Sequence, residues 1–162
     1  MNTTADKIIS LDALETWRAR LRASARRLVV TNGCFDLLHV GHVAYLEGAH
    51  THGDLLLVGV NGDESVRALK GAGRPINTAP DRARILAALQ CVGAVCVFPE
   101  VRATNFLRLA QPDVYVKGGD YTLDKLDPDE RATVERAGGK IVLIPMVPGK
   151  STTALLRQVE GQ

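Results

Sequence analysis

Two histidines stand three residues apart, just after a glycine turn, in this chain of 162 residues. His39 and His42 would share one face of a helix. Before the turn at Asn32–Gly33, residues 28–31 form an apolar, β-branched run typical of a buried parallel strand. A strand, a glycine turn and a helix start bind anions, because free N–H groups and the positive end of the helix dipole point outward. Two imidazoles there indicate phosphate chemistry in which negative charge grows during a reaction.

The elements that must position these histidines alternate along the chain. The sequence predicts strands at residues 28–32, 55–60, 92–98, 114–116 and 141–144. It predicts helices at 11–24, 40–51, 63–69, 80–90, 101–110, 127–137 and 152–159, with Ser10 and Ser151 as caps of the first and the last. Five alternations indicate an α/β fold: a single-domain, Rossmann-like parallel sheet of five strands with helices on both faces. We expect one domain over residues 1–162, with a core at about 28–159 and an N-terminal extension containing a helix at 1–24.

Composition limits the class of protein. The formal net charge is +2 and 46% of the residues are hydrophobic, as in an ordinary soluble domain. The arginines at positions 18, 20, 22, 26 and 27 are expected on the solvated face of a helix, and only 4% of residues are aromatic, so we expect no nucleic-acid partner. No apolar run approaches the ~20 residues of a membrane span. Three cysteines without a Cys-x-x-Cys pair, and no signal peptide, favour a cytoplasmic protein with reduced thiols.

Polar, glycine-rich and cationic residues follow most of the predicted strands. They are Asn32, Gly33, Phe35, Asp36, His39 and His42 after the first strand, Asn61, Gly62 and Asp63 after the second, residues 117–120 after the fourth and residues 149–153 after the last. Because ligands bind outside the carboxyl ends of strands in parallel sheets, we expect one site there. Ordinary turn chemistry explains any one of these loops but not the set.

Three partial motifs suggest other kinds of binding site, but each lacks a residue or a spacing that its site requires. Residues 149–151 end like a phosphate-binding P-loop, but Ile144 stands where its first glycine belongs. Gly71 and Gly73 begin like a dinucleotide fingerprint, but Ile76 replaces the third glycine. The four histidines lack the spacing of a zinc site, so we expect no metal ligands among the side chains.

Residues 32–42 resemble the His-x-Gly-His signature of the nucleotidylyltransferase superfamily, and Ser151–Thr153 resemble the second signature of its cytidylyltransferase-like branch. Four further blocks resemble, more narrowly, the adenylyltransferases of ADP-heptose synthesis: residues 58–66, 74–77, 81–89 and 112–121. The resemblance covers about residues 6–159. The sugar-kinase half found in many of these proteins is absent from this sequence, and Lys150 stands where cytidylyltransferases carry Ile.

The resemblance implies roles around the nucleotide. His39 and His42 would hold phosphate oxygens in the transition state, with Lys117 as a point charge. The remaining nucleotide-binding residues would be Gly33, Cys34 and Phe35 through backbone N–H groups, Gly41 through close approach, Arg82 on the triphosphate, Asp120 on the ribose, and Ser151 and Thr152 on the β- and γ-phosphates. Simpler structural roles stay open: a salt bridge from Lys117 to Asp113 or Asp120, and helix capping by Ser151.

Four residues are expected to face the acceptor substrate. Lys70 and Arg74 would grip its phosphate or close over the site, unless they belong to a plain solvated loop. Asp36 and Asn61 would orient its sugar. Mg²⁺ is expected to arrive with ATP, and relatives imply a homodimer.

The predicted reaction is direct attack by a heptose 1-phosphate on the α-phosphorus of ATP, giving ADP-heptose for lipopolysaccharide or other surface glycans and releasing pyrophosphate. Two alternatives stay open. One is the same chemistry on another acceptor, either glycerol 3-phosphate with CTP or flavin mononucleotide with ATP. The other is an inactive, nucleotide-binding regulatory module.

Overall fold

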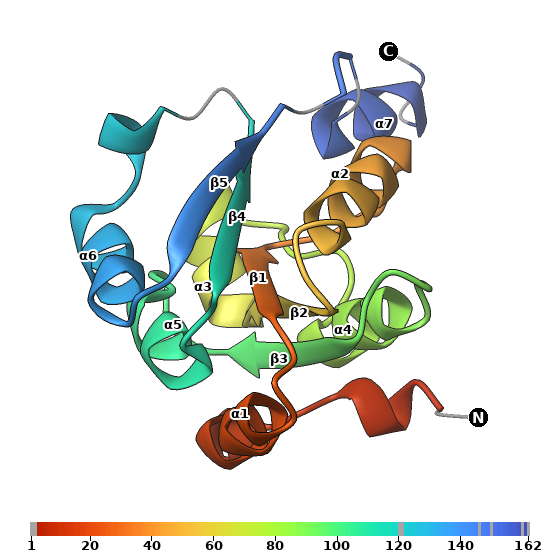
Figure 1. Ribbon diagram of the computed structural model, residues 1–162. Coiled ribbons are helices and arrows are strands. Elements are labelled where there is room, and N and C mark those ends of the chain that lie inside the picture. Colours follow the sequence, from red (N-terminus) through yellow and green to blue (C-terminus); the bar gives the residue numbers. More distant parts are fainter. Residues whose placement is uncertain (1–2, 120–121, 146, 150, 160, 162) are drawn as a thin grey trace.

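The structure, a computed structural model, describes residues 3–119, 122–145, 147–149, 151–159 and 161. Its centre is a five-stranded parallel sheet (Figure 1). The strands are β1 (Leu28–Gly33), β2 (Leu55–Asn61), β3 (Ala94–Phe98), β4 (Val114–Gly118) and β5 (Lys140–Ile144). Continuous apolar runs form the inner strands because both of their faces are covered, and Leu56 and Leu57 are both fully buried. The predicted α/β fold is confirmed.

The strand order is β3-β2-β1-β4-β5, which places β1 at the centre. The chain runs outward from β1 to β3 and then returns to β4, which pairs with β1 through contacts such as Val29 with Val114. The order of strands therefore reverses between β1 and β4. Ligands of open α/β sheets bind beyond the carboxyl ends at such a reversal, here beyond Gly33 and Gly118.

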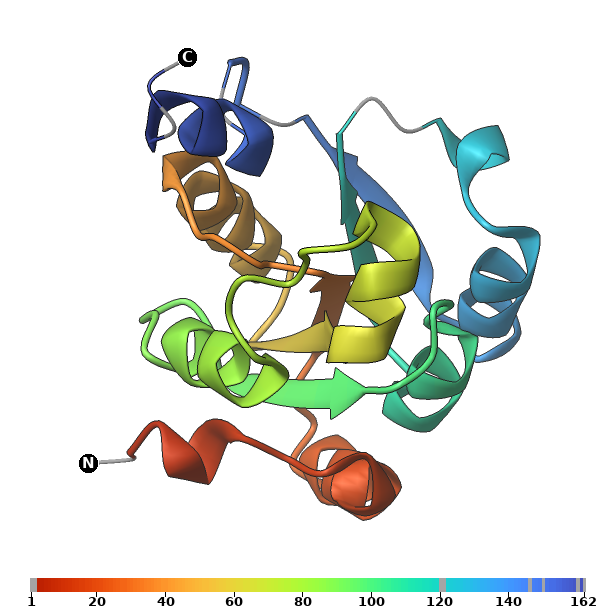
Figure 2. The same cartoon turned by 180° about the vertical axis from the view of Figure 1, so that it is seen from behind.

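Helices cover both faces of the sheet, as Figures 1 and 2 show from opposite sides. The α-helices are α1 (Leu14–Ala23), α2 (Val40–His50), α3 (Asp63–Lys70), α4 (Ala79–Ala87), α5 (Thr104–Ala110), α6 (Pro128–Arg136) and α7 (Thr152–Val159), and 3₁₀ turns lie at Ala5–Lys7, Leu11–Ala13 and Leu123–Lys125. Leu46 of α2 and Leu86 of α4 pack on one face. Leu14 of α1, Phe106 of α5 and Val134 of α6 pack on the other. Among the described residues, no helix has both the length and the apolar character needed to cross a bilayer.

Several predicted boundaries differ from the observed ones by two or three residues: α4 ends at Ala87 and not at residue 90, and α5 begins at Thr104 and not at residue 101. The N-terminal helix begins as a 3₁₀ turn, and the Ser10 side chain makes no capping bond; its backbone carbonyl accepts from the Ala13 N–H at 3.1 Å. The prediction of Ser10 as a side-chain cap is therefore wrong. β3 begins later than predicted, because the Val92 N–H still bonds to the Leu89 carbonyl at 3.2 Å in the turn after α4.

Arg18 is buried, so the prediction that it lies on a solvated helix face is wrong. Its Nε donates to the Gln111 carbonyl at 3.0 Å, and its Nη2 donates to Asp113 Oδ1 at 2.9 Å. The other Asp113 oxygen accepts from the Leu28 N–H at 2.7 Å. Arg18 and Asp113 therefore join α1 to the starts of β1 and β4, and Asp113 supplies the counter-charge of a guanidinium that is only 2% exposed. Arg18 Nη1 has no hydrogen-bond partner among the described residues.

We expect Asp113→Ala to lower the free energy of unfolding by about 2 kcal/mol, because it leaves the Arg18 guanidinium buried without its carboxylate. Urea unfolding at pH 7 measures the change. Asp12→Ala is the matched control, since Asp12 is exposed and should change stability little. An equal effect of the two substitutions would contradict the assigned role of the buried pair.

Candidate active site

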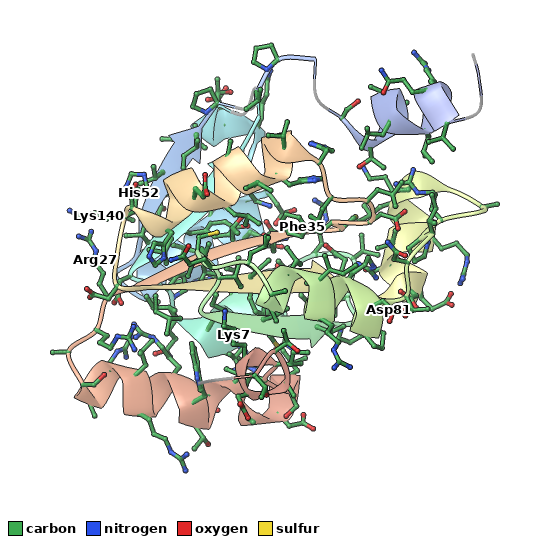
Figure 3. All side chains as sticks on the ribbon, turned by 90° about the vertical axis from the view of Figure 1, so that its right-hand side faces the viewer. Lys7, Arg27, Phe35, His52, Asp81 and Lys140 are labelled. Carbon is green, nitrogen blue, oxygen red and sulfur yellow. The ribbon has the colours of Figure 1, made fainter. Side chains whose placement is uncertain are left out.

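A cavity of about 610 Å³ opens at the carboxyl ends of the strands. The predicted site residues that line it are Gly33, Cys34, Phe35, Asp36, His39, His42, Asn61, Lys70, Arg74, Lys117, Ser151 and Thr152. Figure 3 shows Phe35 far along the sheet from three residues at the amino-terminal ends of the strands, Arg27, His52 and Lys140. Residues from five separate stretches of the chain thus meet at one edge, as the loop chemistry predicts.

The turn after β1 has a constrained backbone. Phe35 has a φ of 45°, in the left-handed region that bulky residues rarely occupy. Its ring fills the space beside Gly33, where an added Cβ would lie 3.0 Å from Phe35 Cε2. Arg82 Nη1 donates to the Cys34 carbonyl at 2.6 Å, which fixes the direction of the turn. A side chain at position 33 would therefore require the Phe35 ring to shift, and glycine brings the main chain to the cavity wall without that shift.

The two histidines stack at the N-terminus of α2. Their ring centroids are 3.8 Å apart with an interplanar angle of 25°, and the edge of Phe35 contacts His42. His39 occupies the N-cap position with extended backbone, so the helix begins between the two residues. Burial, together with the neighbouring His39, lowers the pKa of His42 to about 4. His42 is therefore neutral at pH 7 and can donate one N–H bond to a ligand.

Lys117 extends from the end of β4 toward the same cavity. Its Nζ donates to Asn32 Oδ1 at 3.1 Å and lies 3.8 Å from Glu130 Oε2. The suggested salt bridge to Asp113 is wrong, because Asp113 binds Arg18 at the other end of β4. Burial lowers the pKa of Lys117, and the negative charge of Glu130 partly opposes that shift.

Asp36 organises the loop after α3. Its carboxylate accepts from Arg74 Nε at 2.5 Å and from the backbone N–H groups of Ile76 and Asn77 at 2.8 and 3.0 Å. Burial acts to raise the pKa of Asp36, but the bonds from Asn77, Arg74 and Ile76 outweigh it and hold the pKa below its usual value. Asp36 lines the cavity with both oxygens already engaged, whereas the exposed Lys70 reaches the same wall from the end of α3.

The last loop and β2 contribute hydroxyl and amide groups. Ser151 Oγ accepts from the Ala154 N–H at 3.1 Å, so its predicted capping of α7 is confirmed. Thr152 Oγ1 donates to the Leu37 carbonyl at 3.2 Å, which ties α7 to the loop before α2. Asn61 is buried and its Nδ2 donates to the Glu100 carbonyl at 3.2 Å. All three predicted residues therefore have structural bonds and also line the cavity.

Two predicted residues that the structure describes, Arg82 and Gly41, do not line the cavity. Arg82 is 1% exposed and lies behind the turn, where its Nη2 also donates to Asp63 Oδ1 at 2.8 Å. The Arg82 guanidinium is buried, so the prediction that it contacts the triphosphate directly does not fit its position. It can affect a triphosphate only indirectly, by holding the Cys34 carbonyl and with it the turn. Gly41 is buried within the first turn of α2. Asp120 lies outside the described residues.

Three residues surround Lys117. Asn32 was expected at this edge of the sheet but without a particular role, and sequence reasoning did not single out Tyr115 or Glu130. The Tyr115 hydroxyl lies 2.7 Å from Asn32 Oδ1 and 3.2 Å from Glu130 Oε2. Tyr115 could have been found, because residues two apart on a strand share one face and Lys117 is on the same strand. Glu130 lies on α6, and nothing in its local sequence distinguishes it from the exposed acids of that helix.

The side chains that the structure describes do not form a metal site by themselves. Across the described residues, no group of three His, Cys, Asp or Glu side chains is placed to bind a metal ion. The carboxylates on the cavity wall also have partners already. Asp36 binds Arg74, and Asp127 pairs with Arg102 at 3.1 Å while it caps α6.

The low pKa of His42 predicts a pH-dependent stability. In the unfolded chain this imidazole takes up a proton below about pH 6.5, but in the folded chain only near pH 4. Between these values the unfolded state binds more protons, so stability falls as the pH drops. We expect His42→Gln, which cannot titrate, to lose less stability than the parent chain between pH 7 and pH 5 in urea unfolding. Equal losses in the two proteins would show that His42 does not make this contribution.

The doubly wound parallel sheet, with paired histidines, a lysine and hydroxyl groups around one cavity at the strand reversal, fits a nucleotidyltransferase. Residues 30–156 match the family described as cytidylyltransferase-like. The chain belongs to this family.

Several relatives align with most of this chain. The bifunctional protein HldE of Geotalea uraniireducens is 50% identical over 153 residues, 94% of this chain and 31% of that protein. HldE of Streptomyces coelicolor is 50% identical over 144 residues, 88% of this chain and 31% of that protein. The chain thus spans about a third of the length of these relatives. The crystal structure of a lipopolysaccharide core biosynthesis protein from Thermoplasma volcanium has a TM-score of 0.62 at 25% identity, covering 75% of this chain and 97% of its own.

Proposed function

We propose that this chain transfers the adenylyl group of ATP to a heptose 1-phosphate, giving ADP-heptose and pyrophosphate. The observation that carries the proposal is the convergence of the stacked His39 and His42, from the start of α2, with Lys117, from the end of β4, on one cavity. Donors on two sides of one cavity suit a substrate with several phosphates, whose charge no single side chain could neutralise.

The choice of acceptor is supported by the relatives. The two HldE proteins are named as bifunctional, and the Thermoplasma volcanium protein is named for lipopolysaccharide core biosynthesis. These names agree with the resemblance of residues 112–121 to the adenylyltransferases of ADP-heptose synthesis. The proposed product would then be used for lipopolysaccharide or another surface glycan.

The nucleotide would occupy the side of the cavity formed by β1, α2 and α7. Backbone N–H groups of Gly33, Cys34 and Phe35 would face the phosphates, with the positive end of the α2 dipole behind them. His39 and His42 would bind oxygens of the α-phosphate, where negative charge grows. Ser151 and Thr152 would contact the β- and γ-phosphates, Arg82 would hold the turn from behind, and Asp120 would contact the ribose.

The acceptor would lie toward Lys70, Arg74 and Asn61. Arg74 is bound to Asp36, so Asp36 would orient this arginine rather than contact the sugar directly. One oxygen of the sugar phosphate would form a bond to the α-phosphorus while the bond to the β-phosphate oxygen breaks, and pyrophosphate would leave. Lys117 would neutralise charge on the phosphates during this exchange. We assign Mg²⁺ to the incoming ATP, because the described part of the chain contains no group of three or more side chains placed to hold it.

Pyrophosphate release tests the proposal. ATP, CTP and GTP are each combined with Mg²⁺ and with α- or β-heptose 1-phosphate, glycerol 3-phosphate or flavin mononucleotide. We expect turnover with ATP and one heptose 1-phosphate anomer only. Turnover with CTP and glycerol 3-phosphate, or with ATP and flavin mononucleotide, would keep the chemistry and exclude the heptose acceptor. ATP binding without turnover of any pair would instead favour a regulatory module.

A further inference from the structure

Glu130 is a buried acid at the base of the cavity. It is the third residue of α6 and is 6% exposed, whereas the neighbouring Asp129 is exposed. Its Oε1 accepts from the Ala103 N–H at 2.8 Å, and Ala103 is the N-cap residue of α5. Oε1 therefore fixes the carboxylate to the start of α5, and Oε2 is left to interact with other groups.

The second oxygen faces the groups around Lys117. Glu130 Oε2 lies 3.2 Å from the Tyr115 hydroxyl and 3.8 Å from Lys117 Nζ. Asn32 Oδ1 lies across from it, 2.7 Å from the Tyr115 hydroxyl and 3.1 Å from Lys117 Nζ. Lys117 is thus held between an amide oxygen at the end of β1 and a carboxylate oxygen on α6.

We propose that Glu130 is a positioning residue for nucleotidyl transfer: its anchored carboxylate keeps the Lys117 ammonium charged and directed at the phosphate side of the cavity. The inference rests on the proposed function, because it assigns work to Lys117 in that reaction. An ammonium has three N–H donors. The Asn32 amide takes one, the Glu130 carboxylate attracts the charge from below, and a donor remains for a phosphate oxygen.

Burial alone would favour the neutral amine, so a counter-charge is needed. Lys117 has a side chain only 16% exposed, and burial lowers its pKa. Glu130 opposes this shift most strongly, Asp127 and Cys34 oppose it further, and Arg102 adds to it. Glu130 is the nearest of these acids, and its pair with Lys117 is shielded from water on both sides, so it is worth more than an exposed ion pair.

The test is Glu130→Gln, which keeps the shape and the acceptor for the Ala103 N–H but removes the charge. We expect the alkaline limb of the kcat profile to move about one unit lower in pH, because an adjacent carboxylate shifts a pKa by about one unit or more. At pH values above both limbs, kcat should then fall about tenfold. The matched control is Glu135→Gln: Glu135 lies on the same helix, is exposed and pairs only with Arg131 among the described residues, so its profile should not move.

A second readout does not depend on turnover. In protein labelled with [¹³C]lysine, the Cε signal of Lys117, assigned by its loss in Lys117→Met, should titrate at lower pH in Glu130→Gln than in the parent chain. An unmoved Lys117 titration would overturn the inference, as would a fall in kcat that is equal at all pH values. If the parent chain turns over no substrate pair but the titration does move, the proposed function fails while the coupling of Glu130 to Lys117 stands.

Glu130→Asp provides a variant in case the glutamine fails to fold. Aspartate keeps the charge but holds it farther from Lys117 Nζ. The alkaline limb of kcat and the titration of the Lys117 Cε signal should therefore both lie between those of the parent chain and those of Glu130→Gln. A Lys117→Met, Glu130→Gln double variant adds a coupling test: removing the Glu130 charge should cost no further activity once Lys117 is gone. If the activity losses of the two single variants instead multiply in the double variant, Glu130 supports only the folded structure and does not act through Lys117.

Discussion

Replacing His42 with alanine is expected to lower kcat by about 100- to 1000-fold, the cost typical of removing one preorganised donor to a developing oxyanion. His42 is neutral at neutral pH, since burial and the neighbouring His39 hold its pKa at about 4. It therefore acts as an N–H donor in the free protein and not as a fixed positive charge. Because the charge on the α-phosphate grows only as the reaction proceeds, we expect a larger change in kcat than in the KM for ATP.

Steady-state pyrophosphate release with the active substrate pair measures this effect. His52→Ala is the matched control, because His52 lies at the opposite end of the sheet from Phe35 and the cavity (Figure 3) and should keep full activity. Circular dichroism checks that both variants fold. A loss of less than about fivefold in folded His42→Ala would remove His42 from the proposed transition-state contacts and limit it to packing beside His39.

Replacing Lys117 with methionine is expected to lower kcat by a similar factor of about 100 or more, because the variant keeps the apolar stem but loses the charge that would neutralise the phosphates. The side chain is held by Asn32 and Glu130, so little entropy is lost when it meets a phosphate oxygen. Lys117→Arg should recover only part of the activity, since a planar guanidinium does not fit the place of a compact ammonium.

Two features make the result on Lys117 interpretable. Lys117→Met leaves the Glu130 carboxylate buried without its cation, so its free energy of unfolding must be compared with that of the double variant carrying Glu130→Gln. Lys125→Met is the matched control, because Lys125 lines the same cavity but is exposed at the end of a 3₁₀ turn and has no proposed role. If both lysine variants retain full activity, the phosphate charge is neutralised elsewhere.

The local elements could be predicted because their signals are local. The run Leu55–Val60 is apolar without interruption and ends at Asn61–Gly62, which indicates a buried parallel strand, and the structure contains that strand as β2. Pro80 lies in the first turn of α4, as its fixed φ favours. The edge of the sheet that carries the site could be predicted too, because all parallel strands of one sheet end at the same side.

The partners of charged side chains could not be predicted in this way. Arg18 resembled its exposed neighbours in sequence, but it is buried against Asp113, 95 residues away along the chain. Arg82 was expected on the cavity and lies behind the turn, bonded to Cys34. Such pairs depend on which strands become neighbours, and periodicity within one segment carries no information about that.

The sequence by itself determined the α/β class, the order of its elements, the glycine turn followed by two histidines, and the edge of the sheet where polar loops gather. Each of these follows from residue types at short spacing, because backbone conformation and burial impose local patterns. Only the tertiary structure decided that Asp36 holds Arg74, that the histidine rings stack, and that Glu130 lies beneath Lys117. These contacts join segments brought together by the strand order β3-β2-β1-β4-β5, and charge pairing within a folded protein depends on that arrangement in space.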